Sequence, residues 1–375
     1  MKVSFFKHSL ARDELNNIAK VFKSETLSTG SFCKKFEKLF SNRFKVKFCS
    51  TFSSWTMGSY TLLKSLNFNK GDEVIVSPLT WVSSINTIVL SGATPIFVDV
   101  DLKTGLIDPE SIRDKISKKT KAIIVVHLYG QMCDMRKISK ICKKDKIKII
   151  EDCAHCLEGK RNNILPGQLS YAAIFSFYAT KNITCGEGGA VITNNKKLDR
   201  DLKLARYHGR NNKINDKLIY NHWDIEQISL KSNLTDLSAS ILIPQLGKIN
   251  QNWNKRKLIW DKFNNFFKKY KDIRILDKCK DSKHSMHLYT FLVSPNLRDK
   301  ILKSLIKKRI GTSVHYRSIS ELRYYKKKIL KKNIPNAIEI GRSTITLPFY
   351  PELKIKEINY ILNSLKQIFL RYKIN

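Results

Sequence analysis

Short hydrophobic runs alternate with amphipathic segments between residue 45 and about residue 245. Four runs contain short stretches of consecutive apolar residues, which is typical of strands buried on both faces: DEVIVS, PIFVDV, KAIIVVHLYG and IKIIEDCAH. Other segments carry apolar residues at the spacing of a helix face: GSYTLLKSLNF, SSINTIVLSG, DPESIRDKI and DMRKISKICKK. This alternation of strand and helix predicts a parallel sheet that is covered by helices.

The two ends of the chain depart from this central pattern. The first fifty residues predict helices over DELNNIAKVFK and CKKFEKLFSNRF. After residue 245 the pattern predicts a long helix, IPQLGKINQNWNKRKLIWDKFNNFFKKY, then strands HLYTFLV and GTSVHY and helices LRDKILKSLIKKR and IKEINYILNSLKQIFLRY. We therefore expect two domains, as the length of 375 residues suggests. Residues 1–245 hold the N-terminal helices and a large domain, and residues 246–375 hold a linking helix and a small C-terminal α+β domain.

Charge, apolar stretches and cysteine content argue against several classes of protein. The net charge of +37 would suit nucleic-acid binding, but the lysines are spread along the whole chain and no nucleic-acid-binding motif is present. No apolar stretch approaches the ~18 residues of a membrane span, and the N-terminus lacks the apolar core of a signal peptide. Cys153 and Cys156 form a C-x-x-C without the second pair of a zinc ribbon. We expect a cytoplasmic protein with reduced thiols, no metal site, no membrane insertion and no nucleic-acid partner.

Lys181 stands out among the many lysines because of its neighbours in FSFYATKNITCGEGGAVIT. The preceding run YAAIFSF has the composition of a buried strand, and GEGGAVIT leads into a second one. A lysine held between two buried strands is partly desolvated, which lowers the pKa of its amine and makes it a better nucleophile. Such a lysine can form an imine with a carbonyl compound.

Other candidate residues follow the predicted strands. Asp152 comes at the end of KIKIIED, although an aspartate there could equally cap a helix or form an ion pair. Ser54 and Thr56 open a helix whose N–H groups suit a phosphate, although such caps are common. Trp81 follows another strand, where a tryptophan is more often part of the core. Together, these residues supply what pyridoxal phosphate (PLP) requires: a lysine, an acid, a helix start that can bind a phosphate, and a flat aromatic ring.

Several motifs in this order resemble the DegT/StrS-type PLP-dependent nucleotide-sugar aminotransferases. The resemblance covers nearly the whole chain and rests on FNKGDEVIVSPLTWVSSINTIVLSGATPIFVDVD, VVHLYGQMCDM, IIEDCAHCLEGK, AIFSFYATKNITCGEGGAVIT, NLTDLSASILIPQL, GTSVHY and TLPFYPEL. It implies the fold-type-I aminotransferase architecture: a large domain with a mostly parallel seven-stranded sheet flanked by helices, and a smaller α+β C-terminal domain. Within the family, the chain is most similar to C4 aminotransferases such as the enzyme that forms UDP-4-amino-4-deoxy-L-arabinose.

The resemblance also implies roles for particular residues. Lys181 would form the imine with PLP and then move a proton between the substrate carbon and the cofactor, while Asp152 would bond the pyridine nitrogen. The implied cofactor-binding residues are Trp55, Thr56, Trp81, Asp152, His155, Ser176, Lys181 and Asn233, and the implied substrate-binding residues are Tyr178, His315 and Tyr316. Trp55 stands where relatives usually have glycine or alanine, Tyr178 replaces a commoner histidine, and no arginine follows Asn233. Asn233 matches a residue that reaches the phosphate from the partner subunit, which implies a homodimer.

The function implied is transfer of an amino group from L-glutamate, which becomes 2-oxoglutarate, to a nucleotide-linked 4-keto sugar. PLP would alternate with pyridoxamine 5′-phosphate, and the product would serve surface-glycan or amino-sugar biosynthesis. A 3-aminotransferase, a dehydratase or a non-catalytic regulator on the same fold are alternatives. The presence of both Lys181 and Asp152 favours an enzyme, because a regulator needs no residue that moves a proton.

Overall fold

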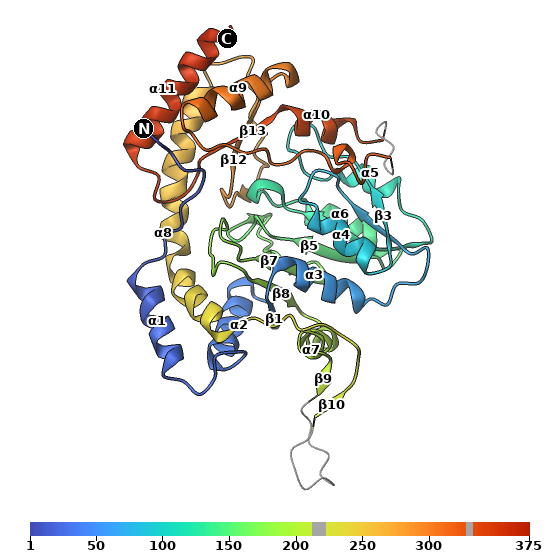
Figure 1. The fold of residues 1–375 in the computed structure, drawn as a ribbon. Helices are drawn as coiled ribbons and strands as arrows, with labels where there is room; N and C mark the ends of the chain where they lie inside the picture. The colour runs from blue at the N-terminus through green and yellow to red at the C-terminus, as the bar shows by residue number, and fades with distance from the viewer. Residues whose placement is uncertain (212–222, 328–332) are drawn as a thin grey trace, which may run out of the picture.

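A seven-stranded sheet lies at the centre of the computed structural model, which describes residues 1–211, 223–327 and 333–375 (Figure 1). The strands are β1 (Phe48–Phe52), β2 (Glu73–Val76), β3 (Thr94–Phe97), β4 (Thr120–Val126), β5 (Lys148–Asp152), β7 (Ala172–Ser176) and β8 (Gly189–Thr193). Their order is β1-β8-β7-β5-β4-β2-β3. β8 runs antiparallel to β1 and β7, and the other neighbours are parallel. The prediction of a mostly parallel, seven-stranded sheet is therefore confirmed.

Helices pack on this sheet as the alternation of patterns predicts (Figure 1). They are α3 (Trp55–Lys64), α4 (Ser83–Leu90), α5 (Pro109–Arg113), α6 (Met135–Lys143) and α7 (Lys196–Ala205). In α6, Met135, Ile138 and Cys142 are buried at helical spacing while the lysines between them face solvent, and the Asp134 carboxylate accepts a hydrogen bond from Lys137 N–H at the first turn. Strand β1 is not among the predicted elements, because its middle residues CST are small and mostly hydroxyl-bearing, which is more typical of a turn. It pairs with β8 along its full length.

A single long helix, α8 (Asp236–Phe267), runs along one side of the molecule (Figure 1). Its first part packs against α1 (Arg12–Phe22) and α2 (Ser31–Phe44), and its later part contacts the C-terminal helix α11 (Ile355–Arg371). The helix begins at Asp236 and not at the predicted Ile243, because Thr235 caps it and Pro244 is accommodated inside it. It passes through residue 245 without a break, and Ile249 and Ile259 lie in two separate hydrophobic cores. The domain boundary stays a prediction.

The C-terminal part contains a two-stranded sheet covered by helices. Its strands β12 (Tyr289–Leu292) and β13 (Thr344–Leu347) pair antiparallel. Around them lie α9 (Pro295–Lys307) and α10 (Pro335–Ser343), whereas the short 3-10 helix η2 (Ile319–Glu321) reaches the segment that follows β2, where the Ile319 N–H donates to the Pro78 carbonyl. The prediction of a strand over GTSVHY is wrong, because residues 311–316 make only one bridge, between Ser313 and Thr346. This segment is irregular, ends in a turn at His315 and Tyr316, and lines a cavity.

Smaller elements complete the described structure. They are η1 (Leu128–Gly130), the pair β6 (Lys160–Arg161) with β11 (Ser282–Lys283), and the pair β9 (Arg210–Asn211) with β10 (Asp224–Ile225), which extends away from the main body (Figure 1). All eight cysteines are free thiols, and Cys153 and Cys156 are both buried. In the described ranges, no helix has the length and apolar character that crossing a membrane requires.

Candidate active site

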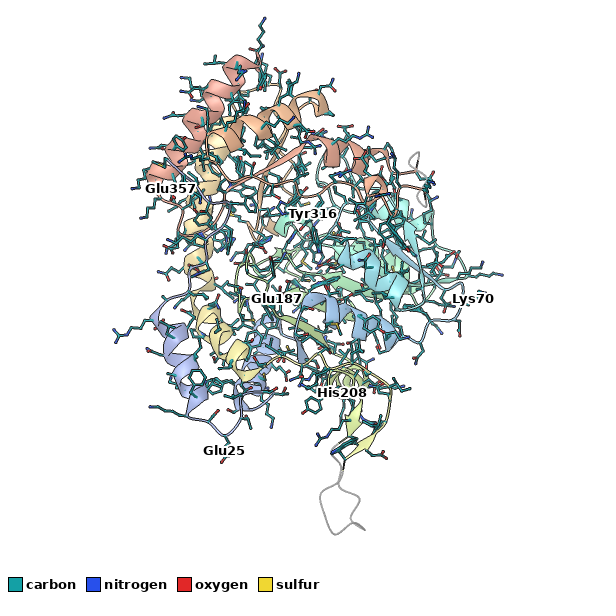
Figure 2. The ribbon with its side chains drawn as sticks, viewed as in Figure 1. Glu25, Lys70, Glu187, His208, Tyr316 and Glu357 are labelled. Carbon is teal, nitrogen blue, oxygen red and sulfur yellow. The ribbon has the colours of Figure 1, made fainter. Side chains whose placement is uncertain are left out.

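A cavity of about 520 Å³ lies where β5 and β7 end, between the large sheet and the C-terminal part. Ligands in open α/β sheets bind at this carboxyl edge of the strands. Every predicted site residue except Asn233 lines it: Trp55, Thr56, Trp81, Asp152, His155, Ser176, Tyr178, Lys181, His315 and Tyr316. In Figure 2, Tyr316 lies above Glu187 near the middle of the molecule, and both residues line this cavity.

Lys181 lies in the connection between β7 and β8, as its neighbours predict. Its backbone N–H donates to the carbonyl of Tyr178 at 2.9 Å, which holds the turn, and its side chain is half-buried. Burial lowers the pKa of Lys181 to about 8, and the nearby charge of Asp152 only partly opposes this effect. The amine is therefore far more often neutral near neutral pH than that of a surface lysine.

Asp152 is the last residue of β5 and is almost fully buried. One carboxylate oxygen accepts from the Ala154 N–H at 3.1 Å, and the other accepts from the Ser84 hydroxyl at 3.0 Å. Burial raises the pKa of Asp152, whereas these two hydrogen bonds and the Lys181 charge act in the opposite direction. The carboxylate is thus held in one orientation at the cavity, on the strand next to the one that leads to Lys181.

The first turn of α3 forms another wall of the cavity. Ser54 caps this helix by accepting from Met57 N–H at 3.1 Å, and the Thr56 hydroxyl lies 3.2 Å from that of Ser83. A Cβ added to Gly189 would lie 2.6 Å from the Ser54 carbonyl, so only glycine lets β8 pass this close to the turn. Free N–H groups at a helix start bind anions well. The Trp55 side chain is only 7% exposed and packs in the core.

His155 and Tyr316 meet across the cavity from two distant parts of the chain. The rings are stacked, with centroids 5.8 Å apart, and the Tyr316 hydroxyl lies 3.0 Å from His155 Nε2. His155 Nδ1 accepts from the Tyr129 N–H at 3.2 Å, and burial lowers the pKa of His155 well below its usual value. Trp81 lies 6.0 Å from Tyr316 and is 61% exposed, so its indole is open at the cavity mouth.

Several cavity residues have no predicted role. Phe5, Phe6, Glu187 and His287 all line the cavity. Two adjacent phenylalanines in an otherwise polar N-terminus are the only sequence signal for Phe5 and Phe6. His287 gives no signal, because a histidine before a strand is unremarkable without its neighbours in space.

Asn233 does not line the cavity of its own chain. Its side-chain amide donates to the hydroxyls of Thr29, at 2.6 Å, and Ser28, at 2.9 Å, and its oxygen accepts from the Lys231 ammonium. The residue is buried beside the end of β1, where it bridges to Phe52. Its predicted contact with a cofactor in a partner subunit stays a prediction.

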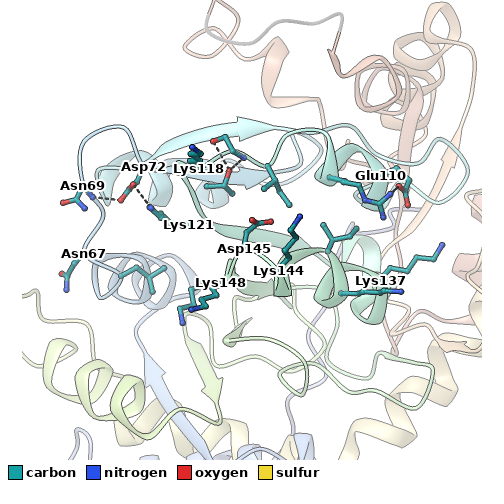
Figure 3. Close-up of a pocket in the computed structure, with 18 residues that line it drawn as sticks. Asn67, Asn69, Asp72, Glu110, Lys118, Lys121, Lys137, Lys144, Asp145 and Lys148 are labelled. Atoms are coloured by element: carbon teal, nitrogen blue, oxygen red, sulfur yellow. Dashed lines mark hydrogen bonds and ion pairs between the residues drawn. The ribbon is translucent and has the colours of Figure 1, made fainter.

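A larger hollow of about 1380 Å³ lies at the opposite edge of the sheet, where β4 and β5 begin (Figure 3). Most of its charged lining residues are lysines, among them Lys118, Lys121, Lys137, Lys144 and Lys148. Lysine and arginine outnumber acids 69 to 32 in the whole chain, so this excess of positive charge is not specific to the hollow. The smaller cavity is the better candidate, because it alone of the two contains Lys181 and Asp152.

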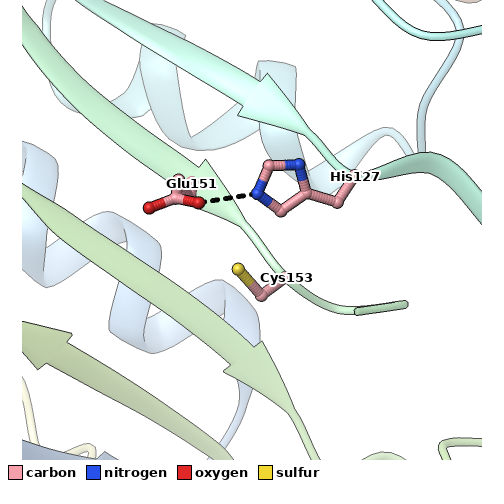
Figure 4. A group of neighbouring side chains, drawn as sticks. All are labelled: His127, Glu151 and Cys153. Atoms are coloured by element: carbon pink, nitrogen blue, oxygen red, sulfur yellow. Dashed lines mark hydrogen bonds and ion pairs between the residues drawn. The ribbon is translucent and has the colours of Figure 1, made fainter. Parts of the chain in front are cut away.

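His127, Glu151 and Cys153 form a buried cluster at the ends of β4 and β5, with potential metal-ligand atoms within 4.8 Å of one another (Figure 4). His127 Nε2 lies 2.7 Å from Glu151, and His127 Nδ1 accepts from the Cys133 N–H at 3.1 Å. The second Glu151 oxygen accepts from Gly167 N–H at 2.8 Å and from the Ser170 hydroxyl. These hydrogen bonds already account for the ring nitrogens and the carboxylate, so we interpret the cluster as a link between the two strands.

Comparisons with known proteins agree with this arrangement. The family model described as "DegT/DnrJ/EryC1/StrS aminotransferase family" matches residues 8–366. The chain is 34% identical over 372 residues to the uncharacterized protein MJ1066 of Methanocaldococcus jannaschii, covering 97% of this chain and 96% of that protein. It is 30% identical over 369 residues to the spore coat polysaccharide biosynthesis protein SpsC of Bacillus subtilis, covering 96% and 95%.

Solved structures of sugar aminotransferases have the same fold. The putative sugar aminotransferase Spr1654 of Streptococcus pneumoniae, in its apo form, matches with a TM-score of 0.93 and 27% identity, covering 99% of this chain and 98% of that one. Spr1654 is also known in PLP and PMP (pyridoxamine phosphate) forms. Helicobacter pylori PseC, an aminotransferase involved in the biosynthesis of pseudoaminic acid, matches with a TM-score of 0.92 and 27% identity, covering 99% and 100%.

Proposed function

The chain belongs to the DegT/DnrJ/EryC1/StrS aminotransferase family and is a PLP-dependent aminotransferase, and we propose that it transfers the amino group of L-glutamate to a nucleotide-linked 4-keto sugar. The observation that carries this proposal is the placement of Lys181 and Asp152 in one cavity with the start of α3. A lysine amine, a buried carboxylate and a helix N-terminus with hydroxyl groups are the donor set that suits PLP.

Each part of the cavity would hold a different part of the cofactor. Asp152 would accept a hydrogen bond from the protonated ring nitrogen, His155 would lie beside the 3-hydroxyl, and Trp81 would cover the ring. The phosphate would lie at the start of α3, with the Thr56 and Ser176 hydroxyls and the backbone N–H of Trp55. When bound, PLP supplies a ring that delocalises the electron pair left on the substrate carbon after deprotonation.

Lys181 would do the proton transfer that the reaction needs. An amine whose pKa lies at about 8 exchanges its proton readily near neutral pH, because neither of its two forms is strongly disfavoured there. Asp152 would keep its charge when a protonated ring nitrogen faces it, since an opposite charge at contact distance favours the ionised form of a carboxyl group. The stacked Tyr316 and His155 would restrict the access of water from the C-terminal side.

The mouth of the cavity would bind the nucleotide sugar. Tyr178 and Trp81 are exposed there, and His315 and Tyr316 face them from the C-terminal part. Aromatic rings suit the faces of a sugar and a base, and the positive charge of the chain would attract an anionic diphosphate. SpsC and PseC are named for polysaccharide and pseudoaminic acid biosynthesis, which supports an amino-sugar product for this chain.

We also propose that the protein acts as a homodimer in the cytoplasm. Asn233 lies outside its own cavity, so a role at the cofactor would require a second copy of the chain. The free, mostly buried thiols fit a reducing compartment.

The substrate is tested by incubating the purified protein with L-glutamate and a panel of UDP-, GDP- and dTDP-linked keto sugars. We expect a 4-keto sugar to gain an amino group, detected by mass, together with 2-oxoglutarate. The Lys181→Ala variant serves as the control and should give neither product. Amination of a 3-keto sugar alone, or loss of water in place of amination, would contradict the proposed reaction.

A further inference from the structure

A buried network of hydrogen-bonded side chains connects α8 with Asn182, the residue that follows Lys181. Arg256 Nη2 lies 2.5 Å from Glu158 Oε1, and these two side chains are 2% and 1% exposed. The second Glu158 oxygen accepts from the Asn182 amide nitrogen at 2.7 Å. Asn182 Oδ1 in turn lies 2.9 Å from Nδ1 of His287. This series of hydrogen-bonded side chains therefore ends at His287, which lines the cavity.

The chemistry of these groups decides which nitrogen of His287 carries the proton. An ionised carboxylate only accepts hydrogen bonds, so Asn182 must turn its NH₂ group toward Glu158. The same NH₂ group also donates to the Ser285 carbonyl at 3.2 Å. The Asn182 oxygen is then the atom that faces His287, and it can only accept. His287 Nδ1 must therefore carry the hydrogen, and the Nε2 of the neutral ring has a free lone pair.

The side chain that carries this lone pair lines the cavity together with Lys181. No residue in the described part of the chain hydrogen-bonds His287 Nε2, while Lys181 lines the same cavity. The neighbouring His155, whose ring centroid lies 4.5 Å away, has the opposite arrangement. Its Nδ1 accepts from Tyr129 N–H, so its Nε2 carries the hydrogen and faces the Tyr316 oxygen. The Nε2 of His155 is thus a donor that Tyr316 already accepts from, whereas the Nε2 of His287 is an acceptor.

We propose that His287 is a further residue of the amino-transfer machinery: its unprotonated Nε2 accepts a hydrogen bond from the amine in the cavity, which is that of Lys181 or of the amino donor. Glu158 and Asn182 are positioning residues, because they act only by setting the protonated nitrogen of His287. Bound in this way, an amine has its N–H directed at His287 and its lone pair directed elsewhere, toward the carbon it attacks. In the opposite tautomer, the hydrogen on His287 Nε2 would face the N–H of the amine, and no hydrogen bond could form between them. The inference rests on the proposed role of Lys181 and not on the identity of the sugar.

Burial keeps His287 in the neutral form that this role needs. Its pKa is lowered well below the usual value by burial first, and then by the positive charges of Lys181 and Arg256. A neutral imidazole has one donor and one acceptor nitrogen, so the orientation set by Asn182 decides the function.

The test exchanges the carboxylate of Glu158 for an amide. In Glu158→Gln, the new oxygen must face Arg256, which only donates, so the new NH₂ faces Asn182. Asn182 is then driven to turn its oxygen toward residue 158 and its NH₂ toward His287, losing its bond to the Ser285 carbonyl, and this moves the ring proton to Nε2. Histidine-selective ¹⁵N labelling and NMR of the cofactor-loaded protein report which ring nitrogen is protonated, and a His287→Gln spectrum assigns the signal.

The kinetic readout is the single-turnover rate of the half-reaction with L-glutamate, followed by cofactor absorbance. We expect the rate in Glu158→Gln to fall at least about tenfold, as when a positioned proton acceptor is lost. Glu37→Gln is the matched control, because Glu37 pairs with the buried Arg206 and does not line the cavity. It should leave both the His287 tautomer and the half-reaction rate unchanged within about twofold.

Asn182→Ala is the second variant, in case Glu158→Gln does not fold with the Arg256 charge unpaired. It removes the acceptor for Nδ1–H without adding a charge, so His287 should populate both tautomers and the rate should fall. An Nε2-protonated His287 in the wild type, an unchanged tautomer in both variants, or a changed tautomer with an unchanged rate would each overturn the inference. If the wild-type protein reacts with glutamate but none of the nucleotide sugars reacts, only the proposed substrate is overturned. The half-reaction with glutamate is measured alone and does not depend on the sugar.

Discussion

Phe5 stacks on His315, with ring centroids 5.8 Å apart and planes inclined by 15°. The N-terminal segment is held there by its backbone, because Val3 bridges to Ile310 and its carbonyl accepts from the Gly311 N–H at 2.8 Å. A Cβ at Gly311 would clash with the backbone nitrogen of Phe5, so the glycine allows this close contact. The first residues of the chain thus form part of the cavity wall that the C-terminal part supplies.

We predict that Phe5→Ala raises the KM for the sugar substrate more than it lowers kcat. An aromatic pair contributes about 0.5–1.5 kcal/mol, so the KM should rise up to about tenfold. Phe22→Ala is the control, because Phe22 is an exposed aromatic residue that does not line the cavity. Equal KM values for the two variants would show that Phe5 has no part in sugar binding.

The Lys181→Ala variant should retain less than about 1% of wild-type turnover, because the loss of a covalent catalyst costs orders of magnitude in rate. Circular dichroism should show that the fold survives, since Lys181 makes no ion pair within the described residues. Turnover of more than a few per cent would remove Lys181 from its proposed role.

The reaction of Lys181 with added PLP should depend on pH with a midpoint of about 8. Only the neutral amine attacks an aldehyde, so the rate at which cofactor-free protein gains the absorbance of the bound cofactor should rise through this pH and then level off. A surface lysine would continue to gain reactivity up to its ordinary pKa of about 10.4. Lys181→Ala is the control, because only its other lysines can react. If the reaction rate of the wild type also continues to rise up to about pH 10.4, the lowered pKa of Lys181 is contradicted.

Asp152→Asn should lower the rate of both half-reactions by about a hundredfold or more, because a neutral amide cannot stabilise the protonated ring nitrogen as a carboxylate does. The fold should persist, since asparagine can still accept from Ser84 or Ala154. Asp99→Asn is the matched control: Asp99 is also buried but accepts from the start of α10, away from the cavity. If Asp152→Asn matches the wild type with glutamate and with the keto sugar, the assignment is wrong.

Subunit mixing tests whether Asn233 acts in a partner's site. Asn233→Asp should repel the cofactor phosphate, so this variant and Lys181→Ala should each be nearly inactive alone. In a mixed dimer with contacts in trans, one site carries both changes and the other carries neither. Random mixing makes about half the dimers mixed, so activity should recover to about a quarter of wild type across an isologous interface.

The control for this experiment is verification of subunit exchange, for example with two differently tagged chains. Absence of recovery after exchange would show that Asn233 acts within its own chain, or not at the cofactor at all. Asn233→Asp also loses the amide that donates to the Ser28 and Thr29 hydroxyls of its own chain, so circular dichroism must first show that this variant is folded.

The sequence by itself determined the fold class and named ten of the residues that line the cavity. Continuous apolar runs have few alternatives to buried strands, and residues that follow parallel strands meet at one edge of the sheet. For that reason Asp152 and Lys181, at the ends of neighbouring strands, could be assigned to one site before their positions were known. Local pattern was less informative where partners are distant: β1 was missed, and the irregular segment that carries His315 and Tyr316 was wrongly predicted as a strand.

Only the tertiary structure decided how the side chains are oriented within the site. Phe5 reaches the cavity through a bridge between Val3 and Ile310, and Asn182 lies between Glu158 and His287, which come from separate loops. A hydrogen bond depends on which atom of one group faces which atom of another, and sequence spacing carries no information about that direction. The tautomer of His287 is therefore a property of the folded chain, set by a carboxylate whose own charge is held in place by Arg256 on α8.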